Sequence, residues 1–71
     1  MRLIVYTERG PIGTITYENG ELTGSNPGLQ EIADGERQLA GSPEAAFRRL
    51  SGHTNGYISY VPEEQVSNSG D

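Results

Sequence analysis

The chain has 71 residues, which is enough for one small domain. It contains no cysteine, which excludes disulfides and a thiolate zinc site. Because it has only one histidine, any metal site would need carboxylate and carbonyl oxygens. Its net charge is −5, and an acidic chain repels the phosphate backbone of nucleic acids. We therefore expect no metal, no cofactor and no nucleic-acid partner.

The opening residues 2–9 and the following stretch 12–18 are rich in β-branched and aromatic side chains, which predicts two strands. Asn19-Gly20 then provides the residue types that a two-residue hairpin turn needs, because both positions adopt positive φ. A short third strand over 21–23 is expected to pair back. This part of the chain therefore predicts a β-meander.

The middle of the chain predicts two short helices. Asn26 precedes a proline and is expected to cap a helix over 28–34, which Gly35 would end. Ser42 precedes another proline and is expected to cap a second helix, over 43–50.

Within the second helix, Glu44 and Arg48 have the i,i+4 spacing of an ion pair. A closing strand is expected over 57–61. The order β-β-(β)-α-α-β predicts an α+β fold, with a small, mostly antiparallel sheet and two short helices on one face. We expect a single domain over 1–61 and a flexible acidic and polar C-terminal tail over 62–71.

Both faces of the expected sheet carry large apolar side chains. Leu3 and Val5 alternate with Ile4 and Tyr6 along the first strand, and two short helices cannot cover both faces. Such side chains can be scattered singly on a surface, or they can form a patch that binds a partner. A small core favours the second interpretation, because partner contact adds stability. The predicted partner interface consists of Ile4, Tyr6, Ile12, Tyr57, Ile58 and Tyr60.

His53, in the stretch SGHTNGYISY, is the residue that would suggest an enzyme. A histidine-based nucleophile system also needs a hydroxyl or thiol and an acid arranged around the imidazole, and the neighbouring Ser51 and Thr54 do not by themselves provide that geometry. Gly52 and Gly56 instead fit the end of a helix and a turn into a strand. We interpret the stretch as a structural junction and expect neither catalytic residues nor enzymatic activity.

Carboxylates also occur in pairs, at Glu63-Glu64 and at Glu31 and Asp34. Acid–base chemistry requires a cleft that separates the pKa values of such a pair, and a short chain has little room for one. We expect these groups to be surface acids.

The glycine-containing loop 23–28 precedes a helix, as phosphate-binding loops do, but the P-loop pattern and lysine are both missing from the chain. We expect a connecting loop. Arg48 and Arg49 could contact an acidic partner or form a solvated helix face. The sequence leaves open whether these arginines or the acidic residues contribute to an interface.

The segments RLIVYTERGPIGTITYENGELTG and SPEAAFRRLSGHTNGYISYV resemble short uncharacterised α+β proteins of actinobacteria and their tailed phages. The resemblance covers about residues 2–61 and rests on the N-terminal hairpin, the SPEAAF helix start and the GxxNGY junction. It implies a phage or prophage setting and supplies no catalytic residues.

Two functional hypotheses follow. The first is a non-enzymatic structural or protein-interaction module, such as a minor or decorating capsid-associated component of a phage particle, that binds another protein or a second copy of the chain. The alternative is an acidic regulator or inhibitor that binds a host protein by mimicking the charge of DNA. Residues 2–6 are mostly apolar but the chain turns polar soon afterwards, unlike a signal peptide. No apolar run is long enough to span a membrane. We therefore expect no membrane partner and a cytoplasmic or virion location.

Overall fold

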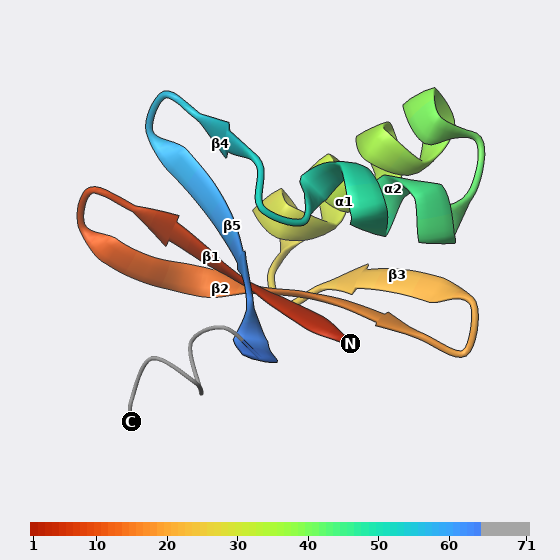
Figure 1. Cartoon of the computed structure of the whole chain (residues 1–71), viewed down its shortest axis with the longest axis horizontal. Helices are drawn as coiled ribbons and strands as arrows, with labels where there is room; N and C mark the ends of the chain where they lie inside the picture. Colours follow the sequence, from red (N-terminus) through yellow and green to blue (C-terminus); the bar gives the residue numbers. More distant parts are fainter. Residues whose placement is uncertain (65–71) are drawn as a thin grey trace.

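The computed structural model describes residues 1–64 and contains a five-stranded sheet and two helices. The elements are β1 (Arg2–Thr7), β2 (Gly10–Glu18), β3 (Glu21–Gly24), α1 (Pro27–Ala40), α2 (Pro43–Leu50), β4 (Thr54–Asn55) and β5 (Ile58–Pro62) (Figure 1). The strand order is β3-β2-β1-β5-β4, and all neighbouring strands are antiparallel. The predicted α+β class and element order are confirmed, and the two-residue β4 is an addition that the sequence did not predict.

The β1–β2–β3 meander forms as predicted. Asn19 and Gly20 both adopt positive φ, 53° and 79°, as a type I′ turn requires. The pairing of β1 with β2 contains one irregularity, because Val5 pairs with Gly13 and Tyr6 pairs with Pro11. Ile12 is therefore the extra residue of a β-bulge, a feature that locally increases strand twist.

Helix α1 is longer than predicted. The Asn26 side chain caps it by accepting a hydrogen bond from the Leu29 amide at 3.0 Å. The prediction that Gly35 ends the helix is wrong, because α1 continues to Ala40 and stops at Gly41, which has a left-handed φ of 89°. Glycine is only a weak helix breaker, and the helix-forming residues that follow Gly35 outweigh its cost of about 1 kcal/mol.

Helix α2 has the predicted bounds. The Ser42 hydroxyl accepts a hydrogen bond from the Ala45 amide at 3.2 Å, and Glu44 and Arg48 form an ion pair at 3.0 Å. Gly52, just beyond the helix, has a φ of 76° and directs the chain back toward the sheet. The predicted cap, ion pair and glycine stop are confirmed.

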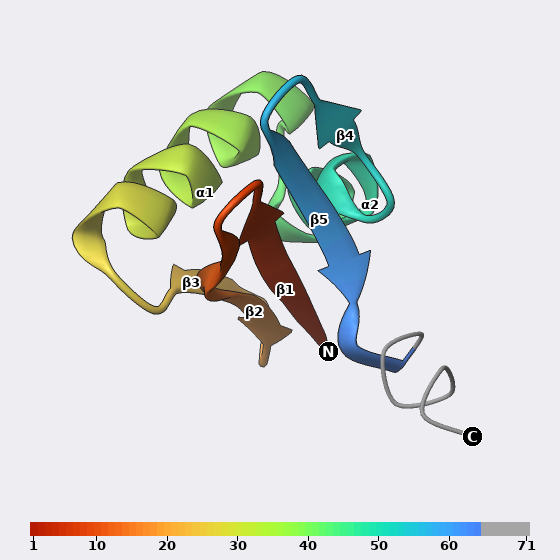
Figure 2. The same cartoon turned by 90° about the vertical axis from the view of Figure 1, so that its left-hand side faces the viewer.

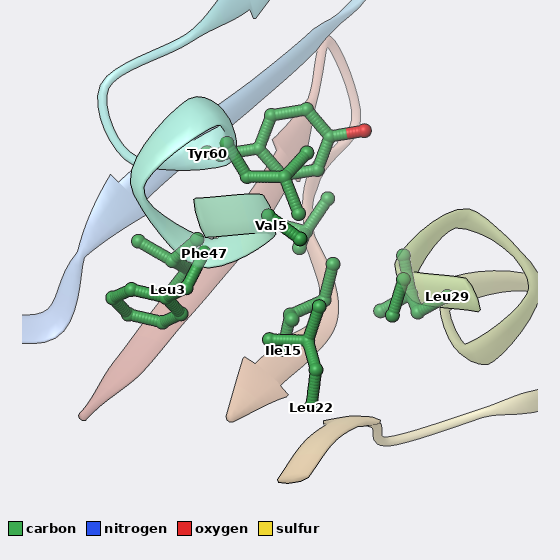
Figure 3. Close-up of a cluster of buried hydrophobic side chains, with 10 residues drawn as sticks. Leu3, Val5, Ile15, Leu22, Leu29, Phe47 and Tyr60 are labelled. Carbon is green, nitrogen blue, oxygen red and sulfur yellow. The ribbon is translucent and has the colours of Figure 1, made fainter. Parts of the chain in front are cut away.

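Both helices pack on the same side of the sheet (Figures 1 and 2), and the core lies between the two layers. Leu3, Val5 and Ile15 are fully buried beneath the helices (Figure 3). The Phe47 ring of α2 lies 5.9 Å from the Tyr17 ring of β2. The buried set is Leu3, Val5, Ile15, Leu22, Leu29, Ala33, Ala46, Phe47, Leu50 and Tyr60. This single-sided packing leaves the other face of the sheet without a helix among the described residues.

The C-terminal end of the described chain is part of the fold. Pro62 belongs to β5, and Glu63 accepts a hydrogen bond from the Arg2 guanidinium at 3.1 Å. The predicted tail over 62–71 therefore begins within ordered structure, and its residues 65–71 lie outside the described residues.

The free edge of β3 is closed by a side chain from α1. The Gln30 amide oxygen accepts a hydrogen bond from the Gly24 amide at 2.9 Å, and its nitrogen donates to the Leu22 carbonyl at 3.4 Å. An unpaired strand edge is a template for pairing with another chain. Gln30 occupies two of the backbone groups that such a chain would use.

We expect Gln30→Ala to lower the free energy of unfolding by about 1–2 kcal/mol, because a partly buried backbone donor and acceptor lose their partner. Gln38→Ala changes an exposed residue of the same helix and should shift stability by less than about 0.5 kcal/mol. Urea unfolding followed by circular dichroism compares the two. Equal effects would show that the Gln30 hydrogen bonds do not stabilise the edge.

Candidate functional site

The face of the sheet opposite the helices is the candidate site, and we call it the outer face. Because side chains alternate along a strand, the burial of Leu3 and Val5 beneath the helices places Ile4 on the outer face. Residues directly opposite one another on paired strands share a face, which extends the assignment across the sheet. The outer face comprises Arg2, Ile4, Tyr6, Thr14, Thr16, Glu18, Glu21, Thr23, Ser59 and Val61.

An apolar strip lies at the centre of the outer face. Ile4 pairs with Val61 of β5, and Tyr6 is the next outer residue along β1. These three residues, which we call the apolar strip, are half-buried although no described helix covers them. Ile12 at the bulge is 43% exposed and lies at the same end of β2 as Pro11, the partner of Tyr6. The strip offers apolar surface to a second molecule.

Beside the apolar strip the outer face is hollowed and polar. An open hollow of about 490 Å³ lies over β2 and β3. Its lining residues are Arg2, Thr14, Thr16, Glu18, Asn19, Glu21, Thr23, Gly24 and Ser25. We call it the threonine hollow.

The threonine hollow carries an unbalanced negative charge. Glu18 and Glu21 are direct cross-strand partners, and like charges in this arrangement repel each other. Arg2 also lines the hollow, but its guanidinium is paired with Glu63. A positively charged group from another molecule would relieve the repulsion between the two glutamates.

The structure brings together only part of the predicted interface. Ile4 and Tyr6 lie on the outer face, Ile12 adjoins it, and Tyr57 is 78% exposed in the turn between β4 and β5.

Tyr60 and Ile58 do not lie on the outer face. Tyr60 is only 6% exposed and Ile58 packs against the core, because Tyr60 pairs with the helix-facing Val5. Their predicted placement with Ile4 is therefore corrected. The alternating residues of β5, Ser59 and Val61, take their place on the outer face.

His53 occupies the junction predicted for it. Its backbone amide donates to the Leu50 carbonyl, and its carbonyl accepts from the Tyr60 amide. The imidazole stacks near the Tyr60 ring, with 6.4 Å between ring centroids. A pocket of about 300 Å³ beside it is lined by Glu36, Arg49, Leu50 and His53, and an ion pair between Glu36 and Arg49 at 3.0 Å spans it. This cluster joins α1 to α2 and to β5.

Tyr60 is the titratable residue most affected by this environment. Burial raises the pKa of its hydroxyl above the usual value of about 10, and the carboxylate of Glu36 raises it further. A raised pKa means that the folded state keeps the proton at pH values where the unfolded chain has lost it.

We therefore expect the free energy of unfolding to fall as the pH rises above about 10, because the unfolded state then binds fewer protons than the native state. Below about pH 10 the Tyr60 contribution is fully present. Urea unfolding at a series of alkaline pH values measures this slope, and Tyr60→Phe should reduce it. Identical slopes in the two proteins would contradict the assignment.

The glycine-containing loop 23–28, which precedes α1, is held by hydrogen bonds to β2. Ser25 accepts a hydrogen bond from the Thr14 amide at 2.9 Å, and Asn26 donates to the Ile12 carbonyl at 3.3 Å, so the loop 23–28 is tied to the free side of β2.

Three of the charged helix residues that the sequence suggested as candidates form a hydrogen bond or an ion pair within the chain. Asp34 accepts from Gln30 at 3.1 Å, Arg48 pairs with Glu44, and Arg49 pairs with Glu36. Within residues 1–64, no three acidic or histidine side chains converge in a way that could hold a metal ion. The outer face therefore remains the candidate site, because it carries apolar side chains that no described helix covers.

The fold and this face define a class: a small α+β domain with two helices on one side of an antiparallel sheet and an uncovered second side. Comparisons with protein families, curated proteins and solved structures gave no significant match. Neither helix in the described part of the chain has the length and apolar character needed to cross a membrane.

Proposed function

We propose that the chain is a non-enzymatic protein-interaction module that binds its partner through the outer face. The observation that carries the proposal is the apolar strip of Ile4, Tyr6 and Val61 on a sheet face that no described helix covers. Sheets in compact domains bury their apolar faces against another layer. A partner protein would supply the missing layer here.

The closure of the sheet edge supports binding through the face. Gln30 occupies the edge of β3, and Ser25 and Asn26 occupy the adjoining part of β2. A partner strand would have to displace these side chains before it could pair. The apolar strip requires no such displacement.

The small size of the domain is a second support. A chain of 71 residues has a core that contributes only a few kcal/mol of net stability. A partner that binds the folded state alone would stabilise it further by mass action.

The finer proposal of a minor or decorating capsid-associated component in a phage particle rests on the sequence resemblance. It predicts that the chain copurifies with assembled particles. The alternative of a DNA-mimicking regulator predicts that Glu18, Glu21, Glu31, Asp34 and Glu36 share one surface. It is less favoured, because the first two lie on the outer face and the other three lie on α1, on the opposite side of the sheet. Glu36 is also paired with Arg49.

Site-specific photocrosslinking in cells that naturally produce the chain tests the proposal. A photoreactive phenylalanine analogue replaces Tyr6 on the outer face, and a matched control places it at Leu39, which is 74% exposed on α1. We expect the analogue at position 6 to crosslink to one discrete protein. The Val61→Asp substitution should abolish this crosslink, and the analogue at position 39 should not form it. Equal capture from both positions, or none from position 6, would contradict the proposal.

A further inference from the structure

We infer that the segment bound on the outer face is an amphipathic α-helix with lysine or arginine along one flank. This inference rests on the proposed function and adds the chemistry of the partner to it. Three properties of the face lead to it: the closed edge of β3, the side-by-side arrangement of apolar strip and threonine hollow, and the charge of the hollow.

The shape and chemistry of the face favour a helix. Gln30 blocks strand addition at β3, and the opposite edge strand, β4, is only two residues long. Both edges therefore offer little backbone for strand pairing, which favours a partner that lies across the side chains of the sheet. The face changes from apolar to polar between neighbouring strands, because Ile4 of the strip pairs directly with Thr14 of the hollow. An amphipathic helix likewise carries an apolar stripe beside a polar flank. It would place its stripe on the apolar strip and its flank over the threonine hollow.

The charge of the hollow favours a basic flank. Glu18 and Glu21 face each other across β2 and β3, and Arg2 is already paired with Glu63. A lysine or arginine entering the hollow would meet the two carboxylates, and the hydroxyl oxygens of Thr16 and Thr23 could accept its remaining hydrogen bonds.

A second copy of the chain is a less suitable occupant. Each copy carries a net charge of −5, so two copies repel each other at long range. Face-to-face packing would also add a second Glu18–Glu21 pair to the interface. A basic helix has the complementary charge instead.

Two synthetic helical peptides of about 18 residues, held helical by a side-chain crosslink, test the inference. Both carry the same leucine stripe, and their flanks carry lysine in one peptide and glutamate in the other. Each is titrated into the isotope-labelled chain and followed by NMR. We expect the lysine peptide to shift the signals of Ile4, Thr16 and Val61 and to bind at least about tenfold more tightly than the glutamate peptide.

Two charge-matched variants sharpen the test. Glu18→Gln/Glu21→Gln should weaken the lysine peptide about fivefold, because it removes two exposed ion pairs. Glu31→Gln/Asp34→Asn removes the same charge from exposed positions on α1 and should leave the affinity unchanged.

The inference is overturned if the glutamate peptide binds as tightly, if the two double variants bind equally, or if the shifts map to the helices. Failure of both peptides to bind would also overturn it. Persistent crosslinking from position 6 would then leave the proposed function standing, whereas loss of that crosslink would remove the proposed function itself.

Discussion

Gly24→Ala is expected to destabilise the domain by about 3 kcal/mol, enough to unfold a large fraction of so small a protein. A Cβ atom added at Gly24 would lie 2.3 Å from the Gln30 amide nitrogen and 2.5 Å from the Leu29 carbonyl carbon. Both atoms belong to the backbone of α1, so no side-chain rotation can relieve the clash. The close approach of β3 to the helix therefore depends on the absence of a side chain at this position.

The same substitution at Gly35 provides the matched control for Gly24→Ala. Gly35 lies inside α1, and apart from the adjoining backbone of that helix and its two chain neighbours, no atom lies within 4 Å of a Cβ added there. Alanine is the better helix former, so Gly35→Ala should stabilise the domain by about 0.5–1 kcal/mol. Thermal and urea unfolding measure both changes. Stability of Gly24→Ala within about 1 kcal/mol of the parent would mean that α1 and β3 are not packed as described.

Phe47→Ala is the second substitution with a large expected effect, a loss of about 3–5 kcal/mol. Phe47 is 6% exposed and is the largest side chain by which α2 contacts the sheet, with its ring 5.9 Å from that of Tyr17. Removing the ring leaves a cavity between α2 and β2. We expect α2 to detach and the cooperative unfolding transition to broaden or disappear.

Phe47→Leu is the control for the cavity, because it keeps an apolar side chain of similar reach and should cost less than about 1.5 kcal/mol. Circular dichroism gives the helix content, and the near-ultraviolet signal of the tyrosines reports packing around Tyr17. A Phe47→Ala protein with native helix content and an unchanged transition would rule out Phe47 as the anchor of α2.

Features with a local cause were predictable from the sequence. The Asn19-Gly20 turn, the caps Asn26 and Ser42, and the ion pair of α2 depend on residues within a few positions of one another. The end of α1 was not predictable in the same way. Gly35 has the residue type of a helix stop, but the residues on either side of it continue the helix to Gly41.

The orientation of β5 shows why part of the candidate site could not be predicted. Alternation along 57–61 indicates two sets of side chains, but it does not say which set meets the helices. That choice is fixed by the pairing of Tyr60 with Val5, two residues far apart in the sequence. Ile4 and Tyr6 could be predicted because Leu3 and Val5 identify the opposite face of the same strand.

The threonine hollow was missed for the same reason. Thr16 and Thr23 become neighbours only when β2 and β3 pair, and Arg2 reaches the hollow from β1. Polar residues on separate strands carry no sequence signal of their own. The alternation of threonine with Ile15 and Tyr17 along β2 was the available indication that one face of this strand is polar.

The central claim is that the outer face binds a protein. The most direct test is methyl NMR of the labelled chain, to which the partner protein identified by photocrosslinking is added in purified, uncrosslinked form. We predict that the methyl signals of Ile4 and Val61 shift or broaden on addition of that protein, while those of Leu39 and Ile32 on α1 stay unchanged. Unchanged Ile4 and Val61 signals at saturation, with shifts confined to the helices, would contradict it.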